Sequence, residues 1–514
     1  MAETELKISL PADETARLLA APVLEGLRLA PRRTETLLSI YQDTPDGALS
    51  AARIALRLRK VGRRWVQTVK SGARATGPGL FSQEEYEIPA PGGRLVLDGP
   101  DPEGALAAVR DVLDGKVPGP VFETRIRRTV ERLRTPDGGE AELAVDVGAV
   151  ACGTDSTPIS EAELELVQGS VAGLYDLARL LFPAGPVRFS SINKAARGYA
   201  LLRGEPEAPA RARKAGSFTY APSSPVEQVA AMVLRDCLAQ ITENLVLVLE
   251  TELPEGPHQL RIGLRRLRTA VGVFGPALGR AALAPVATRA RDLGRVAGRL
   301  RDLDVLISEV VPAGAAGADA EARAALLDRL DAARTEVRAA VRAELAGPEA
   351  TGFLFDLGKL IESRGWLDPA DWGQTLRLAA PVAELAGPML ETAYLKVRKR
   401  GRRIREKDDE ALHELRKTLK TLRYTAEMLE PVHSHDAAKD FVAALRRLQD
   451  IFGSRNDAAM AAELLGTPEA PARDDAAAQR AVGWILGTLE ERSRADTEAL
   501  YDRWDAFRKA DPYW

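Results

Sequence analysis

The sequence predicts an α+β protein in which a strand-rich first half is followed by an all-α second half. Residues 1–203 contain short segments that alternate apolar and charged side chains and are separated by Gly and Pro turn clusters, as in antiparallel hairpins. From residue 225 onward the chain is rich in Ala, Leu and Arg and has helical periodicity. Residues 204–224 lack periodicity and are rich in Pro, Ala, Arg and Ser, which predicts a linker. Because 514 residues are too many for one core, we predict two domains, at 1–203 and 225–508.

The periodicity also predicts where individual helices lie. Amphipathic segments in the first half predict helices at 11–20, 102–114 and 171–182. In the second half, Gly and Pro clusters predict breaks between helices near 253–257, 312–318, 347–351 and 466–473.

The composition is that of a soluble globular protein, with 45% hydrophobic and 28% charged residues. Its net charge is only −3, so any preference for phosphate or nucleic acid must come from local patterning. Cys152 and Cys237 lie in different halves and indicate neither a disulfide framework nor a zinc site. The N-terminal sequence MAETELK lacks a signal pattern and no apolar run is long enough to span a membrane, which predicts a cytoplasmic protein. Arginine greatly outnumbers lysine, a bias that fits a GC-rich bacterial genome.

Charged side chains occupy one face of most of the predicted strands. Glu3, Glu5 and Lys7, for example, alternate with Leu6 and Ile8, and successive side chains of a strand point to opposite faces. The acids with this alternation are Glu3, Glu5, Glu85, Glu87, Asp146, Glu163 and Glu165. The bases are Lys7, Arg57, Arg59, Lys70, Arg125 and Arg127, with Lys194 as a further candidate.

If such strands close into a barrel, the charges line a tunnel and the few amphipathic helices cover the apolar outer faces. Crowded carboxylates repel by roughly 4 kcal/mol per close pair at an effective dielectric near 20, and a divalent cation relieves that repulsion. Carboxylate and water ligands are those that Mg²⁺ or Mn²⁺ prefers, and arginine suits bidentate contacts with phosphate. The pattern therefore predicts a site for a metal ion and a polyanion. The alternative is a solvated sheet face with salt bridges between strands.

In their order along the chain, these segments resemble the CYTH family, also called triphosphate tunnel metalloenzymes. The resemblance covers about residues 1–203. Its motifs are ExExK at Glu3–Lys7, YQDTPD at Tyr41–Asp46, LRLR at Leu56–Arg59, QTVK at Gln67–Lys70, EYE at Glu85–Glu87, Asp146, and ELE at Glu163–Glu165. It implies an antiparallel eight-stranded β-barrel, with flanking helices, whose tunnel binds a triphosphate and Mg²⁺ or Mn²⁺.

The resemblance also implies a role for each charged residue. Metal ligands would be Glu3, Glu5, Asp146, Glu163 and Glu165. The triphosphate would bind Arg57, Arg59, Lys70, Arg125, Arg127 and Lys194. Lys7 would lie near the reacting phosphoryl group, and the catalytic set would be Lys7, Arg57, Arg59, Lys70, Glu85 and Glu87.

Three positions depart from the family pattern. Gln83 stands where an arginine is common, which would weaken phosphate binding. Asn193 replaces a serine before Lys194, and Gln42 replaces a frequent aromatic residue; we expect both to affect packing. None of the three removes a metal ligand.

The second half contains an internal repeat with an offset of 155 residues. The sequence HQLRIGLRRLR from His258 aligns with HELRKTLKTLR from His413, and the register holds without a gap from 258–302 to 413–457. We therefore predict two related helical bundles.

A basic stripe follows one face of the first helix in each copy. The two stripes are His258, Arg261, Arg265 and Arg268, and His413, Arg416, Lys420 and Arg423, each opposite a row of leucines. A basic stripe is usually a solvated helix face balanced by acids four residues away. These stripes contain no acids, which favours an anionic ligand.

This repeat resembles the CHAD domain, a helical domain often found directly after CYTH domains. The resemblance covers roughly residues 225–508 and includes the H-x-L-R-x-x-L-[RK]-x-L-R motif in both copies. It implies that inorganic polyphosphate binds in a basic cleft formed by the two stripes.

Together the two halves predict metal-dependent hydrolysis of inorganic triphosphate, or a related short polyphosphate, in the tunnel. The helical domain would bind polyphosphate and place the enzyme on polyphosphate granules. One alternative is a non-catalytic polyphosphate-binding scaffold. A nucleotidyl cyclase like the class IV adenylate cyclases is less favoured, because the chain has no adenine-recognition signature. Nucleic-acid binding is disfavoured because no aromatic residues interleave the stripes.

Overall fold

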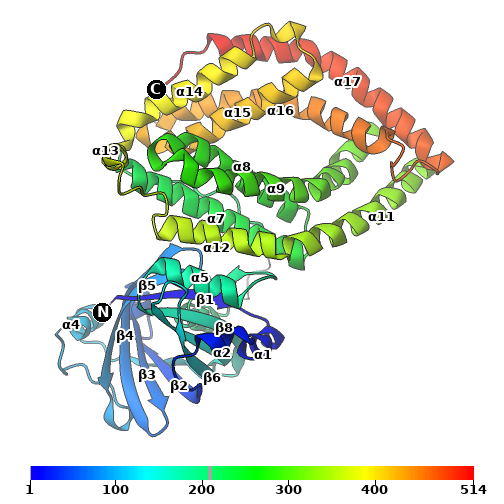
Figure 1. Ribbon diagram of the computed structural model, residues 1–514. Helices are drawn as coiled ribbons and strands as arrows, with labels where there is room; N and C mark the ends of the chain where they lie inside the picture. Colours follow the sequence, from blue (N-terminus) through cyan, green and yellow to red (C-terminus); the bar gives the residue numbers. More distant parts are fainter. Residues whose placement is uncertain (1, 103, 191, 206–210, 434) are drawn as a thin grey trace. The chain divides into compact units, whose positions relative to one another are not determined.

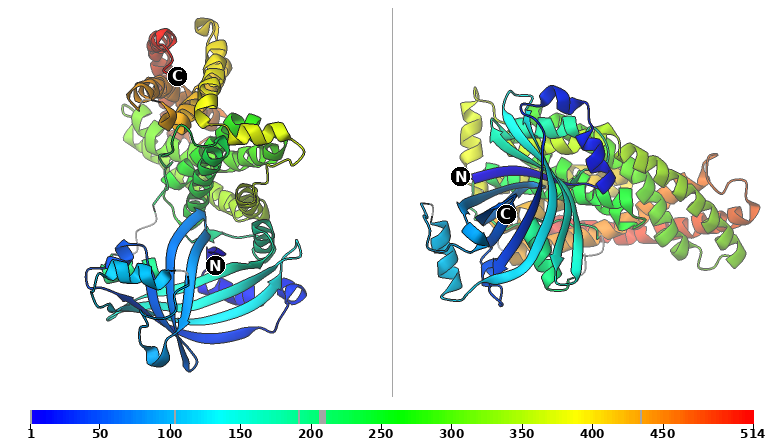
Figure 2. Two further views of the ribbon diagram at one scale, coloured as in Figure 1. Left: turned by 90° about the vertical axis from the view of Figure 1, so that its left-hand side faces the viewer. Right: turned by 90° about the horizontal axis from the view of Figure 1, so that it is seen from below.

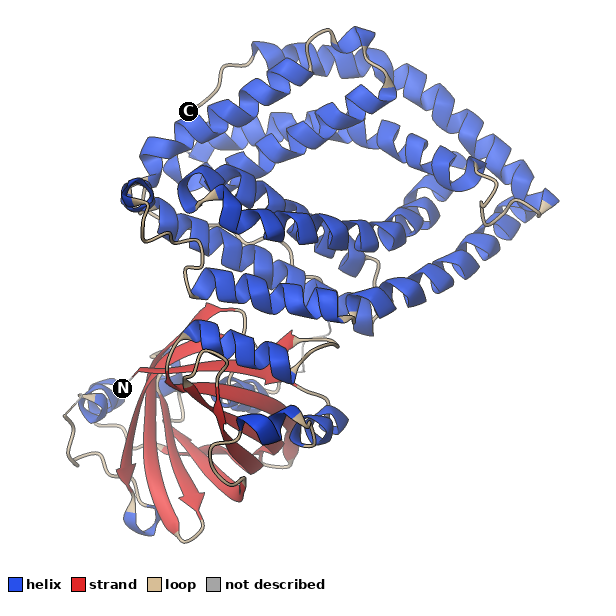
Figure 3. Cartoon of the chain, in the orientation of Figure 1, coloured by secondary structure: helices blue, strands red, loops and turns tan. Residues whose placement is uncertain are grey.

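The computed structural model describes residues 2–102, 104–190, 192–205, 211–433 and 435–514. They form two compact units. The first contains Met1–Arg211 and Thr351–Gly365, and the second contains Ala212–Ala350 and Trp366–Trp514. Strands dominate the first unit and helices make up the second (Figures 1 and 3). Part of the predicted linker, residues 206–210, lies outside the described residues.

The first unit is built around an antiparallel barrel. The strands are β1 Ala2–Ser9, β2 Arg33–Asp43, β3 Ala55–Val61, β4 Arg64–Gly77, β5 Leu80–Pro89, β6 Gly119–Arg134, β7 Glu140–Cys152, β8 Asp155–Gln168 and β9 Arg188–Phe189. Their order is β5-β4-β3-β2-β6-β7-β8-β1-β9, and an additional pairing of β5 with β1 closes the ring. Among the described residues, β1 to β8 therefore form the predicted eight-stranded barrel, and the short β9 pairs with β1 outside the ring.

Helices lie around this barrel, on different sides of it (Figures 1 and 2). They are α1 Ala12–Leu19, α2 Val23–Leu27, α3 Ala48–Ala51, η1 Pro91–Gly93, α4 Ala105–Leu113, α5 Val171–Leu181, α6 Lys194–Leu202 and α12 Pro348–Glu362. The predicted helices at 11–20, 102–114 and 171–182 correspond to α1, α4 and α5.

Two apolar clusters show which faces of the strands point outward and inward. Outer side chains of β3, β4 and β5, such as Leu56, Val69 and Ile88, pack against Leu106 and Val109 of α4. A second cluster lies inside the barrel and includes residues of β2, β6, β7, β8 and α6: Leu37, Tyr41, Phe122, Ile126, Val150, Ile159 and Tyr199. Its members on β2 and β6 alternate along each strand, so Ser39 of β2 and Thr124 and Arg128 of β6 also point inward.

The second unit consists of two helical bundles related by the predicted repeat. Its helices are α7 Val226–Glu250, α8 Glu255–Leu278, α9 Arg280–Val305, η2 Leu306–Val310, α10 Val311–Gly314, α11 Ala320–Leu345, α13 Trp372–Ala379, α14 Val382–Arg400, η3 Ile404–Glu406, α15 Asp409–Leu429, η4 Glu430–Val432, α16 His435–Gly466 and α17 Ala476–Lys509. The 155-residue offset relates α7 to α14, α8 to α15, α9 to α16 and α11 to α17, and each start agrees within one residue. The repeat therefore extends well beyond its aligned motifs.

Within the described residues the two bundles contact each other in several places, including between α7 and α14. Helices α8 and α15, which carry the basic stripes, contact each other. Elsewhere, α9, η2, α10 and α11 of the first copy share an apolar core with α16 and α17 of the second, which includes Leu306, Leu326 and Ile485. The leucine rows opposite the stripes are buried as predicted, for example Leu264 at 1% and Leu419 at 0% exposure.

One segment of the second half departs from the predicted division of the chain. Residues 351–365 include most of α12 and lie between the two repeat copies in sequence, yet they belong to the barrel unit. The helical pattern identifies α12 as a helix, but it does not say which core the helix joins.

Within the described residues, none of the helices has the length and apolar character needed to cross a bilayer.

Candidate functional site

A cavity of about 1280 Å³ occupies the barrel interior. This volume exceeds the range of about 300–1,000 Å³ typical of small-molecule pockets. Most of the predicted tunnel residues line it: Glu3, Glu5, Lys7, Arg57, Arg59, Lys70, Glu85, Glu87, Glu163, Glu165 and Lys194. Strand pairing aligns several of them, because Glu5 of β1 lies beside Glu165 of β8, and Lys7 lies beside Glu163.

Two predicted tunnel residues lie elsewhere. Arg125 and Arg127 of β6 are exposed, and the Arg125 side chain, 74% exposed, pairs with Glu123. Arg128 instead lines the cavity, and its guanidinium lies 2.7 and 2.6 Å from the Asp146 carboxylate oxygens and 2.6 Å from Glu163. The physical reason is the pleat: Ile126 belongs to the interior cluster, so the even-numbered neighbours of Ile126 face inward.

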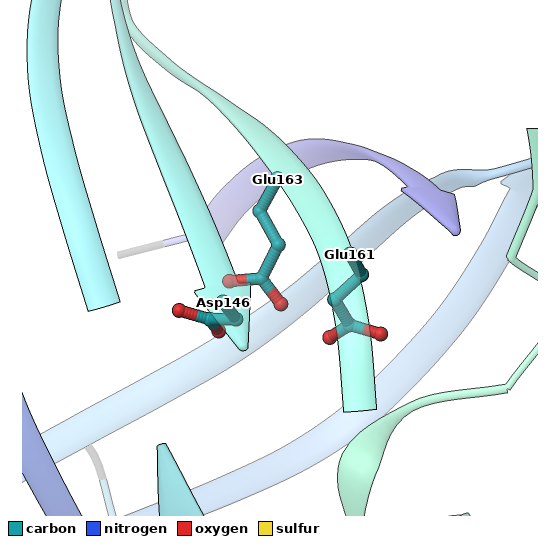
Figure 4. A group of neighbouring side chains, drawn as sticks. All are labelled: Asp146, Glu161 and Glu163. Atoms are coloured by element: carbon teal, nitrogen blue, oxygen red, sulfur yellow. The ribbon is translucent and has the colours of Figure 1, made fainter. Parts of the chain in front are cut away.

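Three buried carboxylates form one group around three cations. Ligand oxygens of Asp146, Glu161 and Glu163 all lie within 4.8 Å of one another (Figure 4). The Lys194 ammonium contacts all three carboxylates at 2.5–2.8 Å, and Lys7 contacts Glu163 at 2.9 Å. Sequence reasoning missed Glu161, although its alternation with Glu163 and Glu165 on β8 was a usable signal.

The cations keep this group ionised. Burial alone would raise the pKa of Glu163, but Lys194, Lys7 and Arg128 hold it well below its usual range. The pKa of Asp146 is lowered in the same way, with burial opposed by Lys194 and Arg128. Burial opposes the charge of Lys194 as well, yet Glu163, Asp146 and Glu161 raise its pKa. This group is therefore already compensated by the protein's own charges.

A second group of carboxylates is compensated only in part, by Lys70, which lies 3.2 Å from Glu3, and by Lys7, which lies 3.2 Å from Glu5. Burial, followed by the charges of Glu3, Glu142 and Glu5, raises the pKa of Glu165 to about 7. Burial and Glu163 raise the pKa of Glu5 in spite of Lys7. The Gln83 amide donates hydrogen bonds of 3.1 Å to both Glu3 and Glu5, so the glutamine at this unusual position bridges the two carboxylates.

The chemistry of this second group fits a divalent cation. Glu3, Glu5 and Glu165 line the cavity, carry excess negative charge and offer the oxygen ligands that Mg²⁺ or Mn²⁺ prefers. In the compensated group, by contrast, Asp146 and Glu161 do not line the cavity and only Glu163 does. Among the described residues, however, it is the compensated group whose ligand oxygens all lie within 4.8 Å of one another.

Guanidinium groups gather elsewhere in the cavity. Arg57 contacts Glu85 at 3.1 Å, whereas Arg59 donates to the neutral Ser39 hydroxyl at 3.2 Å. Burial, and then the charges of Arg57 and Arg128, lower the pKa of Arg59 to about 10. Since a cation with a lowered pKa is under-compensated, this region attracts an anion.

Lys70 and Glu85 connect the two regions. Lys70 lies 3.2 Å from Glu3 and 2.7 Å from Glu85, and Glu87 accepts a hydrogen bond of 2.8 Å from Thr68. Burial opposes ionisation of Glu85, but Lys70 and Arg57 lower its pKa to about 2.

Asn193 is another of the three departures from the family pattern. Its side chain accepts a hydrogen bond of 2.8 Å from the Ala196 amide and so caps α6, as a serine would.

In the helical unit, five of the predicted basic residues come together where α8 meets α15. They are Arg261, Arg265, Arg416, Lys420 and Arg423, all half-buried. Burial, opposed by Tyr424 but reinforced by Arg261 and Arg416, lowers the pKa of Arg265 to about 10. Burial and the neighbouring arginines lower that of Lys420 to about 6. Within the described part of the chain, neither Arg265 nor Lys420 forms an ion pair with a carboxylate.

The remaining stripe residues also interact with this basic cluster, since Lys420 acts on His258, Arg268 acts on Arg265 and Arg416 acts on His413. Arg268 and His413 are exposed, and burial, Arg291 and Arg295 lower the pKa of Arg268 while Asp292 opposes them. His258 is half-buried, and burial and Arg301 lower its pKa. Arg261 also pairs with Asp302 at 2.7 Å, and Asp457 is the repeat-equivalent acid near Arg416.

Comparison with known proteins places these two units in two families. Residues 1–199 match the CYTH domain and residues 232–466 match the CHAD domain. An inorganic triphosphatase of Haemophilus influenzae is 31% identical over 164 residues, which are 31% of this chain and 44% of that protein. The match therefore spans less than half of that relative.

Two further relatives cover more of the chain. An uncharacterized protein of Mycobacterium tuberculosis is 26% identical over 95% of both chains. The crystal structure of the CHAD domain from the plant Ricinus communis covers 59% of this chain and 98% of its own, with a TM-score of 0.50 and 24% identity. That likeness concerns the fold alone. The chain therefore consists of a CYTH domain followed by a CHAD domain.

Proposed function

We propose that the barrel hydrolyses inorganic triphosphate or a related short polyphosphate with Mg²⁺ or Mn²⁺, and that the helical domain binds polyphosphate. One observation carries the first part: a single cavity brings together the carboxylates Glu3, Glu5 and Glu165, of which Glu5 and Glu165 have raised pKa values, and the guanidinium of Arg59, whose pKa is lowered. A metal ion and a phosphate chain neutralise these two regions together. The resemblance to an inorganic triphosphatase supports this assignment.

Each group has a defined task in this proposal. Glu3, Glu5 and Glu165 hold the metal, which when bound neutralises phosphate oxygens and polarises the phosphorus. Arg57, Arg59 and Arg128 donate to the phosphate oxygens and stabilise the charge that develops on them. Lys7, held between Glu5 and Glu163 at 3.2 and 2.9 Å, presents its ammonium to the reacting phosphoryl group.

Measuring phosphate release from tripolyphosphate, ATP and long-chain polyphosphate, each with Mg²⁺, Mn²⁺ or EDTA, tests this function. We expect release from tripolyphosphate with a divalent metal and none with EDTA. Binding of tripolyphosphate without any release favours the scaffold, and formation of pyrophosphate from ATP favours a cyclase.

The basic cluster on α8 and α15 supports the second part of the proposal. Arg265 and Lys420, which are half-buried and have no carboxylate ion pair among the described residues, need an external counter-charge, and a linear polyanion supplies many charges at once. Binding to such a chain would locate the enzyme on cytoplasmic polyphosphate granules.

Glu5→Gln tests the metal site. The change keeps the shape of the side chain and removes one charge from the partly compensated group, so turnover of tripolyphosphate should fall by about 10²-fold. The melting temperature should stay the same or rise, because one crowded buried charge is lost. Unchanged turnover at saturating metal would remove Glu5 from the metal site.

Arg128→Lys and Arg125→Lys separate the buried arginine from its exposed neighbour. Arg128→Lys keeps the charge but loses the fork of donors, whose charge-assisted bonds are worth roughly 1.5–3 kcal/mol, so kcat/KM should fall by about 10-fold or more. Arg125→Lys is the matched control and should be neutral. Equal losses in the two variants would mean that β6 does not have the register described here.

Arg261→Ala combined with Arg416→Ala tests the basic cluster. This double variant should lose affinity for long-chain polyphosphate far more than Arg323→Ala with Arg503→Ala, a control pair of exposed arginines on α11 and α17. Hydrolysis of tripolyphosphate should not change in either. If both pairs lose affinity equally at several salt concentrations, binding is diffuse electrostatics without a specific cleft.

The pH dependence of polyphosphate binding tests Lys420. Its pKa of about 6 in the free protein should rise when a polyanion binds, so binding takes up a proton and affinity falls as pH rises from 7 to 9. Lys420→Arg stays charged across this range and should flatten the profile. Titration calorimetry in buffers with different ionisation enthalpies measures the proton uptake, and its absence would contradict this account.

A further inference from the structure

Helix α12 is joined to the barrel unit by matched polar contacts with α5. Arg179 of α5 pairs with Asp356 of α12 at 2.5 Å, and Lys359 of α12 pairs with Asp176 of α5 at 2.6 Å. The two ion pairs have opposite polarity, so they fix the register of one helix on the other. At the start of α12, the Thr351 hydroxyl donates to the Gly185 carbonyl oxygen at 2.9 Å.

The apolar contacts at this interface are close. A Cβ on Gly358 would lie 2.5 Å from the Tyr175 ring, so only glycine allows this approach of α12 to α5. Phe355 is 1% exposed and stacks on Phe182 with 6.4 Å between ring centroids. Its ring also meets the edge of Phe189 in β9 at 5.7 Å and 89°. Phe355 therefore connects α12 to the strand that lies beside β1.

From Phe189 the contacts continue to the backbone of Lys7. Phe189 pairs with Ile8 of β1, and the next residue, Ser190, donates its amide to the Lys7 carbonyl oxygen at 3.0 Å. The Lys7 amide in turn donates to the Gly79 carbonyl oxygen at 2.8 Å. Gly79 has a φ of 70°, and a Cβ there would lie 2.7 Å from the Phe189 ring and 2.8 Å from the Lys7 carbonyl oxygen. The Lys7 backbone thus bonds to the segment that contains Gly79 and to the segment that contains Ser190. The Phe189 ring packs against Gly79 in the first segment, and Phe189 precedes Ser190 in the second.

We propose that α12 positions Lys7 in the barrel, with Phe355 as the positioning residue that acts through Phe189. The consequence for catalysis rests on the proposed triphosphatase function, whereas the consequence for the Lys7 backbone does not. Since Lys7 contacts both Glu5 and Glu163 through its ammonium, a shift of its backbone changes the whole pattern of charges at the reacting end of the cavity. In this proposal α12, whose sequence lies in the second half of the chain, positions a residue of the first domain.

Phe355→Ala in the full-length chain tests this proposal, with Lys359→Met as the matched control. Lys359→Met removes a contact between α12 and α5 but leaves the contact of Phe355 with Phe189 intact. Phe355→Leu is a second variant that keeps most of the apolar volume while losing the ring edge, in case Phe355→Ala does not fold.

Two readouts are measured on each folded variant. Amide hydrogen exchange should become faster at Lys7 and Ser190 in Phe355→Ala and, to a smaller degree, in Phe355→Leu, while α8 in the helical unit stays unchanged. The kcat for tripolyphosphate should fall by about 10-fold or more with KM nearly constant, because misplacing a reacting group affects the transition state more than binding. Lys359→Met should match the wild type both in amide exchange at Lys7 and Ser190 and in kcat.

The two readouts separate the possible failures. Wild-type exchange at Lys7 and Ser190 in a folded Phe355→Ala protein would overturn the proposal. Equal effects of Phe355→Ala and Lys359→Met at Lys7 would also overturn it, because α12 would then act only by general stability. If the wild-type protein releases no phosphate, the proposed function fails, and the exchange measurement still decides whether α12 positions Lys7.

Discussion

The need to balance charge inside a closed barrel governs the first domain. Buried carboxylates and cations lose most of their hydration, and they remain ionised only where charges of opposite sign are close. Asp146, Glu161 and Glu163 meet this condition through Lys194, Arg128 and Lys7. Glu165 meets it less well, since burial and three neighbouring carboxylates raise its pKa, and so does Arg59, which among the described residues donates to the Ser39 hydroxyl. In the proposed function, the less compensated residues are therefore the ones that bind the metal and the phosphate chain.

Much of this interior could be predicted from alternation alone. The inward face of β1 is unambiguous, because Glu3, Glu5 and Lys7 alternate with residues that need a core. In β6 the run Arg125-Ile-Arg-Arg128 allows either face to point inward, and the decision comes from Ile126, which joins Tyr41 and Phe122 in the interior cluster. That contact joins residues far apart in sequence, so alternation within one strand could not reveal it. Glu161 shows the opposite case. It shares its alternation with Glu163 along the same strand, so the sequence alone could have identified it as an inward-facing residue.

The helical half shows a similar limit. A 155-residue repeat read from two motifs predicts the pairing of α8 with α15, because related helices in a duplicated fold occupy equivalent places. The destination of α12 is not readable in the same way. Apolar residues occur on every side of this helix, and Leu354, Phe355 and Leu357 are all buried. Such a sequence predicts a helix enclosed by other elements, but it does not say which elements these are. Contacts in the structure, such as those with Arg179 and Phe189, assign residues 351–365 to the barrel unit.

Both domains contain half-buried cations with fewer neighbouring carboxylates than cations. This shared arrangement suits the binding of polyanions. The difference between them lies in the carboxylates. In the helical domain Asp302 and Asp457 lie near single arginines, and no group of uncompensated acids accompanies the basic cluster among the described residues. In the barrel, Glu3, Glu5 and Glu165, which are compensated only in part, lie within the same cavity as the arginines. Breaking a phosphoanhydride requires charge to be stabilised on both sides of the bond, whereas holding a chain requires only counter-charge. This difference in the placement of acids is why the proposed function puts the chemistry in the barrel and only binding in the helices.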